Sequence, residues 1–156
     1  VVAIMAADDP GVTLLRDIDM AGLEAYRERL DPVDLRRAVH VLTENERVLA
    51  AVEALEADDH AALGQLMAGS QASMRDDYAI TCPEIDTLVE ISAAVPGVVG
   101  SRMTGGGFGG CTISMVQRDA VHDLHAVVER EYPARTGCQP RIWSVSAGAG
   151  AGLVEG

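Results

Sequence analysis

A run of glycines between residues 105 and 110 constrains this chain more than any other feature. Five of these six residues are glycine, and the exception is Phe108. Glycine has no Cβ, so its backbone reaches positive φ angles and approaches other groups closely, at a high entropic cost of ordering. Two interpretations follow from the spacing. Bare backbone N–H groups can form a concave nest that binds anions, or the glycines can serve a tight hairpin or a crowded backbone crossing.

The segments on both sides of the glycines favour β-structure. Residues 98–103 form a short β-prone run, and residues 111–117 alternate in side-chain character. Gly105, Gly107 and Gly110 satisfy the G-x-G-x-x-G pattern of dinucleotide sites, but that pattern needs a helix after the loop. Because a strand is expected there, and no G-x-x-x-x-G-K sequence occurs, we predict neither a dinucleotide site nor a P-loop.

Helical spacing dominates the first two thirds of the chain. Asp58 is a plausible N-cap, and Pro83 suits the first turn of a helix. The longest segment carries two apolar stripes, which indicates a helix buried on more than one side. These stripes are Leu35, Val39, Leu42, Leu49 and Val52, and Val41, Val48 and Leu55. Helices are therefore expected at about residues 19–30, 33–57, 59–74 and 83–95.

The order of these elements predicts an α+β fold in one domain over residues 1–156. Residues 119–132 return to helical spacing, and residues 141–147 are expected to form a last strand. The sheet is expected to be small and antiparallel. The predicted divisions are a mainly helical part over 12–96, a β-β-α-β part over 97–147, and a flexible tail over 148–156.

The charged residues exclude several classes of function. All twelve basic residues are arginine, and the formal net charge is −12. Without lysine, the chain has no phosphate-binding P-loop lysine, no Schiff base and no lysine nucleophile. An acidic surface also disfavours nucleic acid and anionic membranes as partners. The excess of acid is expected to serve mainly solubility.

The three cysteines, Cys82, Cys111 and Cys138, are widely spaced and form no C-x-x-C pair. Neither a disulfide framework nor a zinc site is predicted, and a reducing cytoplasm fits this usage. The apolar start of the chain is too short to span a bilayer and lacks the basic front of a signal peptide. We expect a cytoplasmic protein.

Three sequence blocks together resemble the galactokinases of the GHMP kinase superfamily. The segment from Arg102 to Gly110, RMTGGGFGG, is similar to the third glycine motif of that family. Residues 40–48, HVLTENERV, resemble its long-helix block, and residues 73–78 followed by 82–86 resemble its next block. The similarity covers about residues 12–147. Galactokinase is favoured over the related N-acetylgalactosamine kinases, and one departure is Gln71, where the family often has histidine.

The resemblance implies a GHMP kinase C-terminal domain with a ferredoxin-like sheet, one strand of which comes from upstream in the family. Intact galactokinases transfer phosphate from ATP to the C1 hydroxyl of galactose with Mg²⁺ present. Their sugar-contact motif, their Ser-rich glycine loop and their catalytic aspartate lie in the N-terminal half and have no counterpart here. This chain is therefore expected to be the C-terminal half, inactive alone, without catalytic or metal-binding residues and without tight binding of ATP or Mg²⁺.

The same resemblance assigns the glycine segment to the substrate and phosphate site. The residues expected to line that site are Thr104, Gly105, Gly106, Gly107, Phe108, Gly109 and Gly110. Arg102 suits bidentate phosphate binding, but a structural ion pair with one of the 24 acidic residues is favoured for it. The expected partners are the N-terminal half of the enzyme, galactose and ATP.

Other polar residues have structural interpretations that outweigh catalytic ones. His40 lies in an apolar helical pattern and is expected to be a satisfied core histidine. His122 and His125 lack a third ligand for a metal. Asp76 and Asp77 do not share a helix face, which disfavours a Mg²⁺ pair. Cys111 is expected to be a small packed side chain.

Two alternatives to a kinase half remain open from the sequence. The chain could be a stand-alone, non-catalytic module that binds a partner or self-associates through an exposed interdomain face, because exposed apolar patches mark interaction sites. It could also be a decayed gene product without a function.

Overall fold

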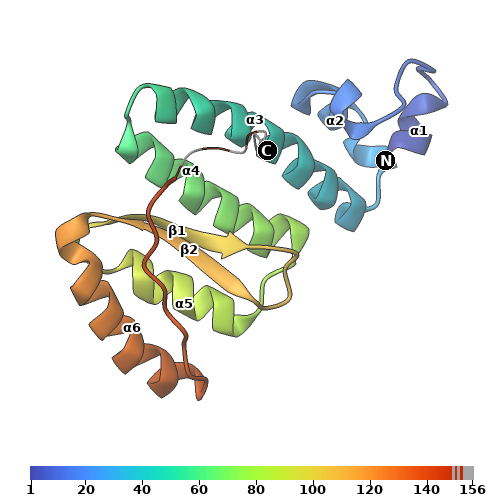
Figure 1. Ribbon diagram of the computed structural model, residues 1–156. Coiled ribbons are helices and arrows are strands. Elements are labelled where there is room, and N and C mark those ends of the chain that lie inside the picture. The colour runs from blue at the N-terminus through green and yellow to red at the C-terminus, as the bar shows by residue number, and fades with distance from the viewer. Residues whose placement is uncertain (149, 151, 153–156) are drawn as a thin grey trace.

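The computed structural model describes residues 1–148, 150 and 152, and these form a mostly helical α+β structure (Figure 1). The α-helices are α1 (Val2–Ala6), α2 (Met20–Ala25), α3 (Pro32–Glu56), α4 (His60–Ser73), α5 (Pro83–Ala93) and α6 (Val121–Thr136). The strands are β1 (Val98–Thr104) and β2 (Cys111–Val116). The shorter turns are η1 (Leu15–Asp17), η2 (Arg27–Arg29) and η4 (Arg118–Ala120), all 3₁₀, and the π-helical η3 (Met74–Tyr78).

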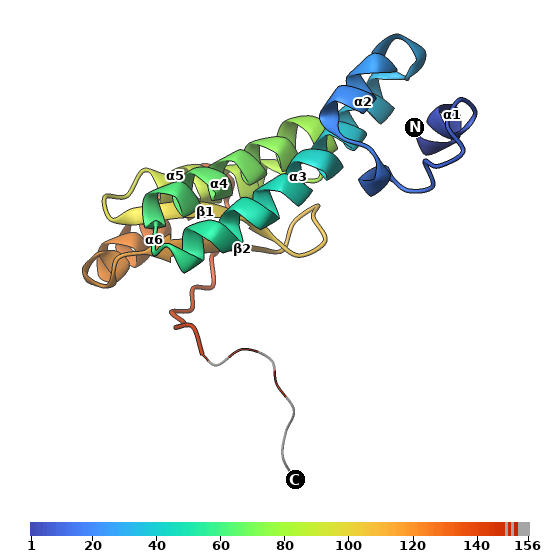
Figure 2. The same ribbon diagram turned by 90° about the horizontal axis from the view of Figure 1, so that it is seen from above.

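The helices are arranged in layers about a β-hairpin. Helix α4 lies along β1, and α3 packs outside α4 as its antiparallel neighbour (Figures 1 and 2). On the other side, α5 contacts both strands and α6 covers α5. The N-terminal elements α1 and α2 lie near the start of α3 (Figure 1). This arrangement leaves the hairpin loop at one end of the sheet, beyond the layers.

Local chemistry explains most helix boundaries. Pro83 begins α5, as expected, because its missing N–H would be unpaired there in any case. Asp59 caps α4 by accepting a hydrogen bond from the Ala62 N–H, whereas the predicted cap, Asp58, takes a left-handed φ of 55° one residue earlier. The expected helix over 19–30 is interrupted at Tyr26, between α2 and η2.

Three apolar clusters hold the layers together. One joins α2 to the first half of α3, a second joins α5 to α6, and a third lies between η3, α5 and β1. The third cluster is centred on Met103, which is fully buried on β1. Met103 therefore anchors the strand that leads directly into the glycine loop. The cluster members are Leu23, Leu30, Leu35, Ala38 and Leu42; Ile91, Val95, Leu124, Val128 and Tyr132; and Met74, Ile85 and Met103.

The prediction of a last strand over residues 141–147 is wrong. The described sheet has two strands, β1 and β2, and residues 141–147 take no regular structure. Trp143 and Val145 are 69% and 84% exposed, so burial does not reward an extended conformation there. A strand also needs a neighbour for its backbone hydrogen bonds, and neither β1 nor β2 pairs with this segment. The predicted flexible tail, 148–156, lies largely outside the described residues.

Candidate functional site

The glycine segment is the loop of an antiparallel hairpin. Thr104 on β1 pairs with Cys111 on β2, so residues 105–110 form the connection. Gly105, Gly107, Gly109 and Gly110 have φ angles between 90° and 125°, a region that residues with a Cβ rarely adopt. The hairpin interpretation is therefore confirmed. The expected strand after the loop is confirmed, so the loop lacks the following helix that a dinucleotide fingerprint requires.

Most of the loop faces open space and is not crowded. A Cβ added at Gly105, Gly106, Gly109 or Gly110 would meet nothing within 4 Å. Gly107 is the exception, because its Cβ would lie 2.7 Å from the Ile80 carbonyl oxygen. That carbonyl also accepts a 2.6 Å hydrogen bond from the Phe108 N–H. One contact with the segment after η3 therefore fixes the loop, and its other backbone groups stay accessible.

Gly106 stands apart from the other loop glycines. Its φ is not positive, and no atom would obstruct a side chain there. Neither backbone conformation nor packing therefore explains a glycine at this position. The open space at Gly106 leaves its backbone accessible to a group from outside the described residues, such as a ligand.

Phe108 is presented to solvent in an unfavourable conformation. Its φ is 58°, and its side chain is 76% exposed. Left-handed conformations of residues other than glycine cost about 1–3 kcal/mol and concentrate at functional sites. Ala79, directly before Ile80, has a similar φ of 53° at the end of η3. Two unfavourable residues thus meet where the loop is fixed, and π-helical turns such as η3 are themselves frequent at functional sites.

Arg102 lies at the base of the loop without the ion pair that the sequence favoured. Its Nε donates a 3.0 Å hydrogen bond to the Met103 carbonyl, and Nη2 lies 3.7 Å from the Met74 sulfur. Within residues 1–148, 150 and 152, no carboxylate pairs with it. The remaining N–H groups of this half-buried guanidinium are available to an anion such as phosphate.

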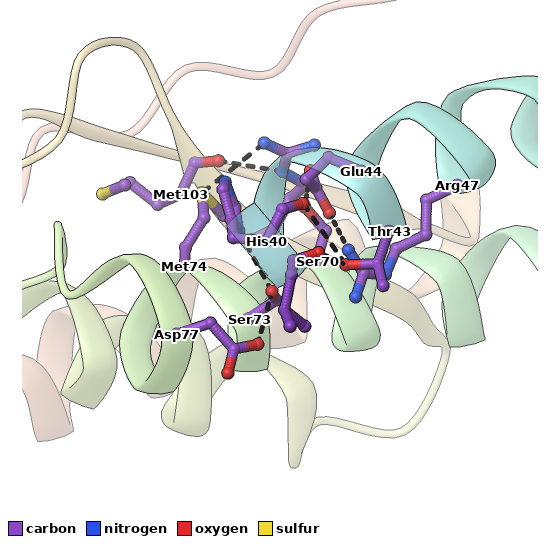
Figure 3. A network of polar contacts seen from close by, with 11 residues as sticks. His40, Thr43, Glu44, Arg47, Ser70, Ser73, Met74, Asp77 and Met103 are labelled. Atoms are coloured by element: carbon purple, nitrogen blue, oxygen red, sulfur yellow. Dashed lines mark hydrogen bonds and ion pairs between the residues drawn. The ribbon is translucent and has the colours of Figure 1, made fainter. Parts of the chain in front are cut away.

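His40 on α3 belongs to a hydrogen-bond chain with Ser73 and Asp77 (Figure 3). Its Nδ1 lies 3.0 Å from the Ser73 Oγ, and the Ser73 hydroxyl donates to Asp77 Oδ2 at 2.8 Å. Because the hydroxyl has one proton and donates it to Asp77, it accepts the proton of His40 Nδ1. Tyr78 stacks on the imidazole with ring centroids 4.5 Å apart. The expectation of a satisfied core histidine is confirmed, since His40 is 8% exposed.

Burial lowers the pKa of His40, and nearby charges adjust the pKa in both directions. The carboxylates of Glu44 and Asp77 raise it, whereas the guanidinium groups of Arg47 and Arg102 lower it, with desolvation the largest effect. The imidazole in the folded protein is therefore more readily deprotonated than in the unfolded chain, where its pKa is about 6.5. Stability that depends on neutral His40 is complete above that pH and is lost as the pH falls below it.

We expect His40→Asn to flatten the pH dependence of stability between about pH 7.5 and 5.5. Asparagine can donate to Ser73 but cannot take up a proton. In the wild-type chain His40 contributes a slope of at most about 1.4 kcal/mol per pH unit, the limit for one proton. Urea denaturation of both chains at several pH values measures this slope. Equal slopes in the two chains would contradict the assignment to His40.

Gln71 on α4 connects three elements below the loop. Its Oε1 accepts a 2.8 Å hydrogen bond from the Met103 N–H, and its Nε2 donates to Asp86 Oδ1 at 2.9 Å. The side chain is 5% exposed, so these bonds are made away from water. Thr81 donates to the other oxygen of Asp86 at 3.1 Å. Gln71 thus fixes β1 against α4 and α5, two residues before the glycine loop begins.

We expect Gln71→Met to lower the free energy of unfolding by about 2 kcal/mol, because a buried N–H loses its acceptor while the side-chain volume is kept. Gln71→His is the matched control, since a neutral imidazole offers both a donor and an acceptor. Its loss should be less than half as large. Thermal and urea denaturation measure both. A methionine variant as stable as the wild type would show that the two bonds contribute nothing.

Solvent exposure or structural contacts account for the other candidate residues. His122 is exposed, and His125 bonds Ser144 at 3.1 Å. Asp76 pairs with Arg75, while Asp77 accepts from Ser73. The described residues contain no cluster of three His, Cys, Asp or Glu side chains that could hold a metal ion. The prediction that Cys111 is packed is wrong: it lies exposed at the end of the loop.

Comparisons with known proteins agree with this geometry. Residues 51–134, more than half of the chain, match the family model described as GHMP kinases C terminal. A crystal structure of Lactococcus lactis galactokinase complexed with galactose superposes with a TM-score of 0.81 and 33% sequence identity. The match covers 87% of this chain and 35% of that chain, so this chain spans about a third of the relative's length. No helix in the described residues combines the length and the apolarity that a membrane crossing requires.

Proposed function

Because the chain belongs to the GHMP kinase C-terminal family, we propose that it is the C-terminal part of a galactokinase. In the complete enzyme, phosphate passes from ATP to the C1 hydroxyl of galactose. The observation that carries this proposal is the open hairpin loop over residues 105–110, with accessible backbone groups and, at Gly106, open space in which a ligand could approach the chain. The similarity to a galactokinase at 33% identity supports the choice of sugar.

The loop and its arginine have the chemistry that phosphate requires. Phosphoryl transfer depends mainly on positioning and on stabilising negative charge, and bare N–H groups and guanidinium groups bind phosphate oxygens. In this proposal the loop from Thr104 to Gly110 lines the substrate site, and Arg102 contacts a phosphate oxygen. The described residues contain no cluster of His, Cys, Asp or Glu side chains that could hold Mg²⁺, so its protein ligands are proposed to lie in the rest of the enzyme. Mg²⁺, when bound with ATP, neutralises charge on the transferred phosphate.

This chain alone is proposed to be inactive, since the sugar-contact and catalytic groups of the family belong to the N-terminal part. The test is an ATP-coupled assay with the part of the Lactococcus lactis galactokinase that this chain does not cover, added separately or fused. Galactose-dependent turnover is expected only when that part is present, and N-acetylgalactosamine should be a poor substrate. Turnover by this chain alone would refute the incompleteness, and no turnover by the fusion would refute the kinase assignment.

A non-catalytic module is the second candidate, favoured by one observation. Helix α3 exposes a row of large aliphatic side chains, including Leu49 at 68% and Leu55 at 62%. An exposed apolar patch on a soluble chain marks an interaction surface. The assay separates the two functions, because a pure binding module gives no turnover in any combination.

A further inference from the structure

The second half of α3 carries a contiguous apolar surface that no described residue covers. We term this surface the α3 stripe. It consists of Val48 (61% exposed), Leu49 (68%), Val52 (48%) and Leu55 (62%). The opposite side of the same helix turns to α4, where Ala54 is buried. Helix α3 forms the outer layer of the molecule (Figures 1 and 2), so the α3 stripe faces outward.

The exposure of the α3 stripe corrects the expectation of a helix buried on more than one side. Within the described residues, only the side of this segment toward α4 is covered. Burying a large aliphatic side chain removes apolar surface from water and thereby stabilises a protein or a complex. Four such side chains on two helical turns therefore represent a large unsatisfied driving force for association. The α3 stripe is as apolar as an obligate interface, whose composition is close to that of a protein core. Transient interfaces are more polar.

The spacing of the α3 stripe fits a helix as its occupant. Val48, Val52 and Leu55 follow one another at intervals of four and three residues, the spacing of a coiled-coil seam. The same spacing continues backward through Asn45 and Val41. A seam of this kind packs against a helix that runs along it, because side chains of one helix insert between those of the other.

The charged residues beside the α3 stripe indicate which charges should border the apolar face of the docked helix. Glu46, Glu53 and Glu56 are exposed on the same stretch of α3. Arg47, the basic residue in this stretch, pairs with Glu44 and faces α4, whose Ser70 donates to the same carboxylate at 2.7 Å. An acidic rim attracts a basic one. A second copy of this chain would instead bring a further net charge of −12, which disfavours self-association.

We propose that the α3 stripe docks an amphipathic helix with an arginine- or lysine-rich rim, supplied by the remaining part of the kinase polypeptide. The inference rests on the proposed function for the identity of that polypeptide. The superposed galactokinase chain supports it, since 35% of that chain is matched here and the rest has no counterpart in this sequence.

The test is a binding titration between this chain and the uncovered part of the Lactococcus lactis galactokinase, by calorimetry at low and high salt. Val52→Glu and Leu55→Glu should each weaken association at least tenfold. Val33→Glu is the matched control, because Val33 is 45% exposed on α3 but lies outside the stripe, and it should leave affinity unchanged. Higher salt should weaken binding to the wild-type chain, since opposite charges are screened.

Three results would overturn the docking proposal: no association with the wild-type chain, equal affinity of the stripe variants, or dimers of this chain that Leu55→Glu converts to monomers. Light scattering on the chain alone checks the last of these, and circular dichroism verifies that each variant is folded. Association that depends on the α3 stripe but yields no galactose-dependent turnover supports the docking surface and refutes only the proposed function.

Discussion

Gly64→Ala is expected to lower the free energy of unfolding by about 3 kcal/mol, because overpacking at a rigid contact forces backbone to move. Gly64 lies inside α4, where a new Cβ would stand 2.1 Å from the carbonyl oxygen of Val99 on β1. The obstructing atom is backbone and cannot rotate away. For a domain of this size the loss corresponds to about 6–12 °C in Tm. Thermal and urea denaturation of the purified chain measure it.

Gly69→Ala in the same helix is the matched control. Its Cβ would meet the flexible Arg47 side chain at 3.4 Å, an ordinary contact. Alanine favours a helix over glycine by up to about 1 kcal/mol, so this variant should be slightly more stable than the wild type. The same substitution, glycine to alanine, is thus expected to lower the free energy of unfolding at Gly64 and to raise it slightly at Gly69. If Gly64→Ala were also stabilising, the close approach of α4 and β1 would be wrong.

The contact at Gly64 matters because it positions the strand that holds the glycine loop. Gly100, the next residue along β1, is also close to α4, because a Cβ there would lie 3.0 Å from the Gly64 Cα. Farther along the strand, Gln71 binds the Met103 N–H. The crowded backbone crossing considered for the glycine loop is therefore found between α4 and β1, about four residues before the loop.

Local signals were sufficient to predict most of the elements. The period of apolar residues indicates α3, and Pro83 marks the start of α5. Both depend on residues close in sequence. The strand expected over 141–147 failed because a strand needs a partner, and alternation in one segment carries no information about a distant edge. The π-helical turn η3, Met74–Tyr78, was likewise missed, since the helix expected from the sequence ends at about residue 74.

For the candidate site, the sequence predicted the backbone of the loop but not the side chains that support it. The glycine run is a local sequence signal, and it forms the expected hairpin loop. The roles of Gln71, Tyr78 and Arg37 come from residues 15 to 40 positions away. Tyr78 stacks on His40, and Arg37 donates to the Asp77 carbonyl and lies over the Tyr78 ring. Such long-range pairs leave no local pattern to find.

Gly106→Val, in this chain fused to the part of the Lactococcus lactis galactokinase that it does not cover, is expected to reduce galactose phosphorylation at least tenfold without lowering Tm. Neither packing nor a positive φ requires glycine at this position, so the folded chain tolerates a side chain there. A ligand close to the loop backbone would not, and displacing a bound substrate by even 1 Å can cost about a hundredfold in rate. Gly148→Ala, also in open space but outside the loop, serves as the control.

The most direct measurement is therefore kcat/KM for galactose and for ATP in three fusions: wild type, Gly106→Val and Gly148→Ala. A glycine loop that lines the transfer site predicts a large loss for Gly106→Val alone, with thermal stability unchanged. If Gly106→Val phosphorylates galactose as efficiently as the wild type, the loop does not approach the reacting groups, and its place in the active site is contradicted.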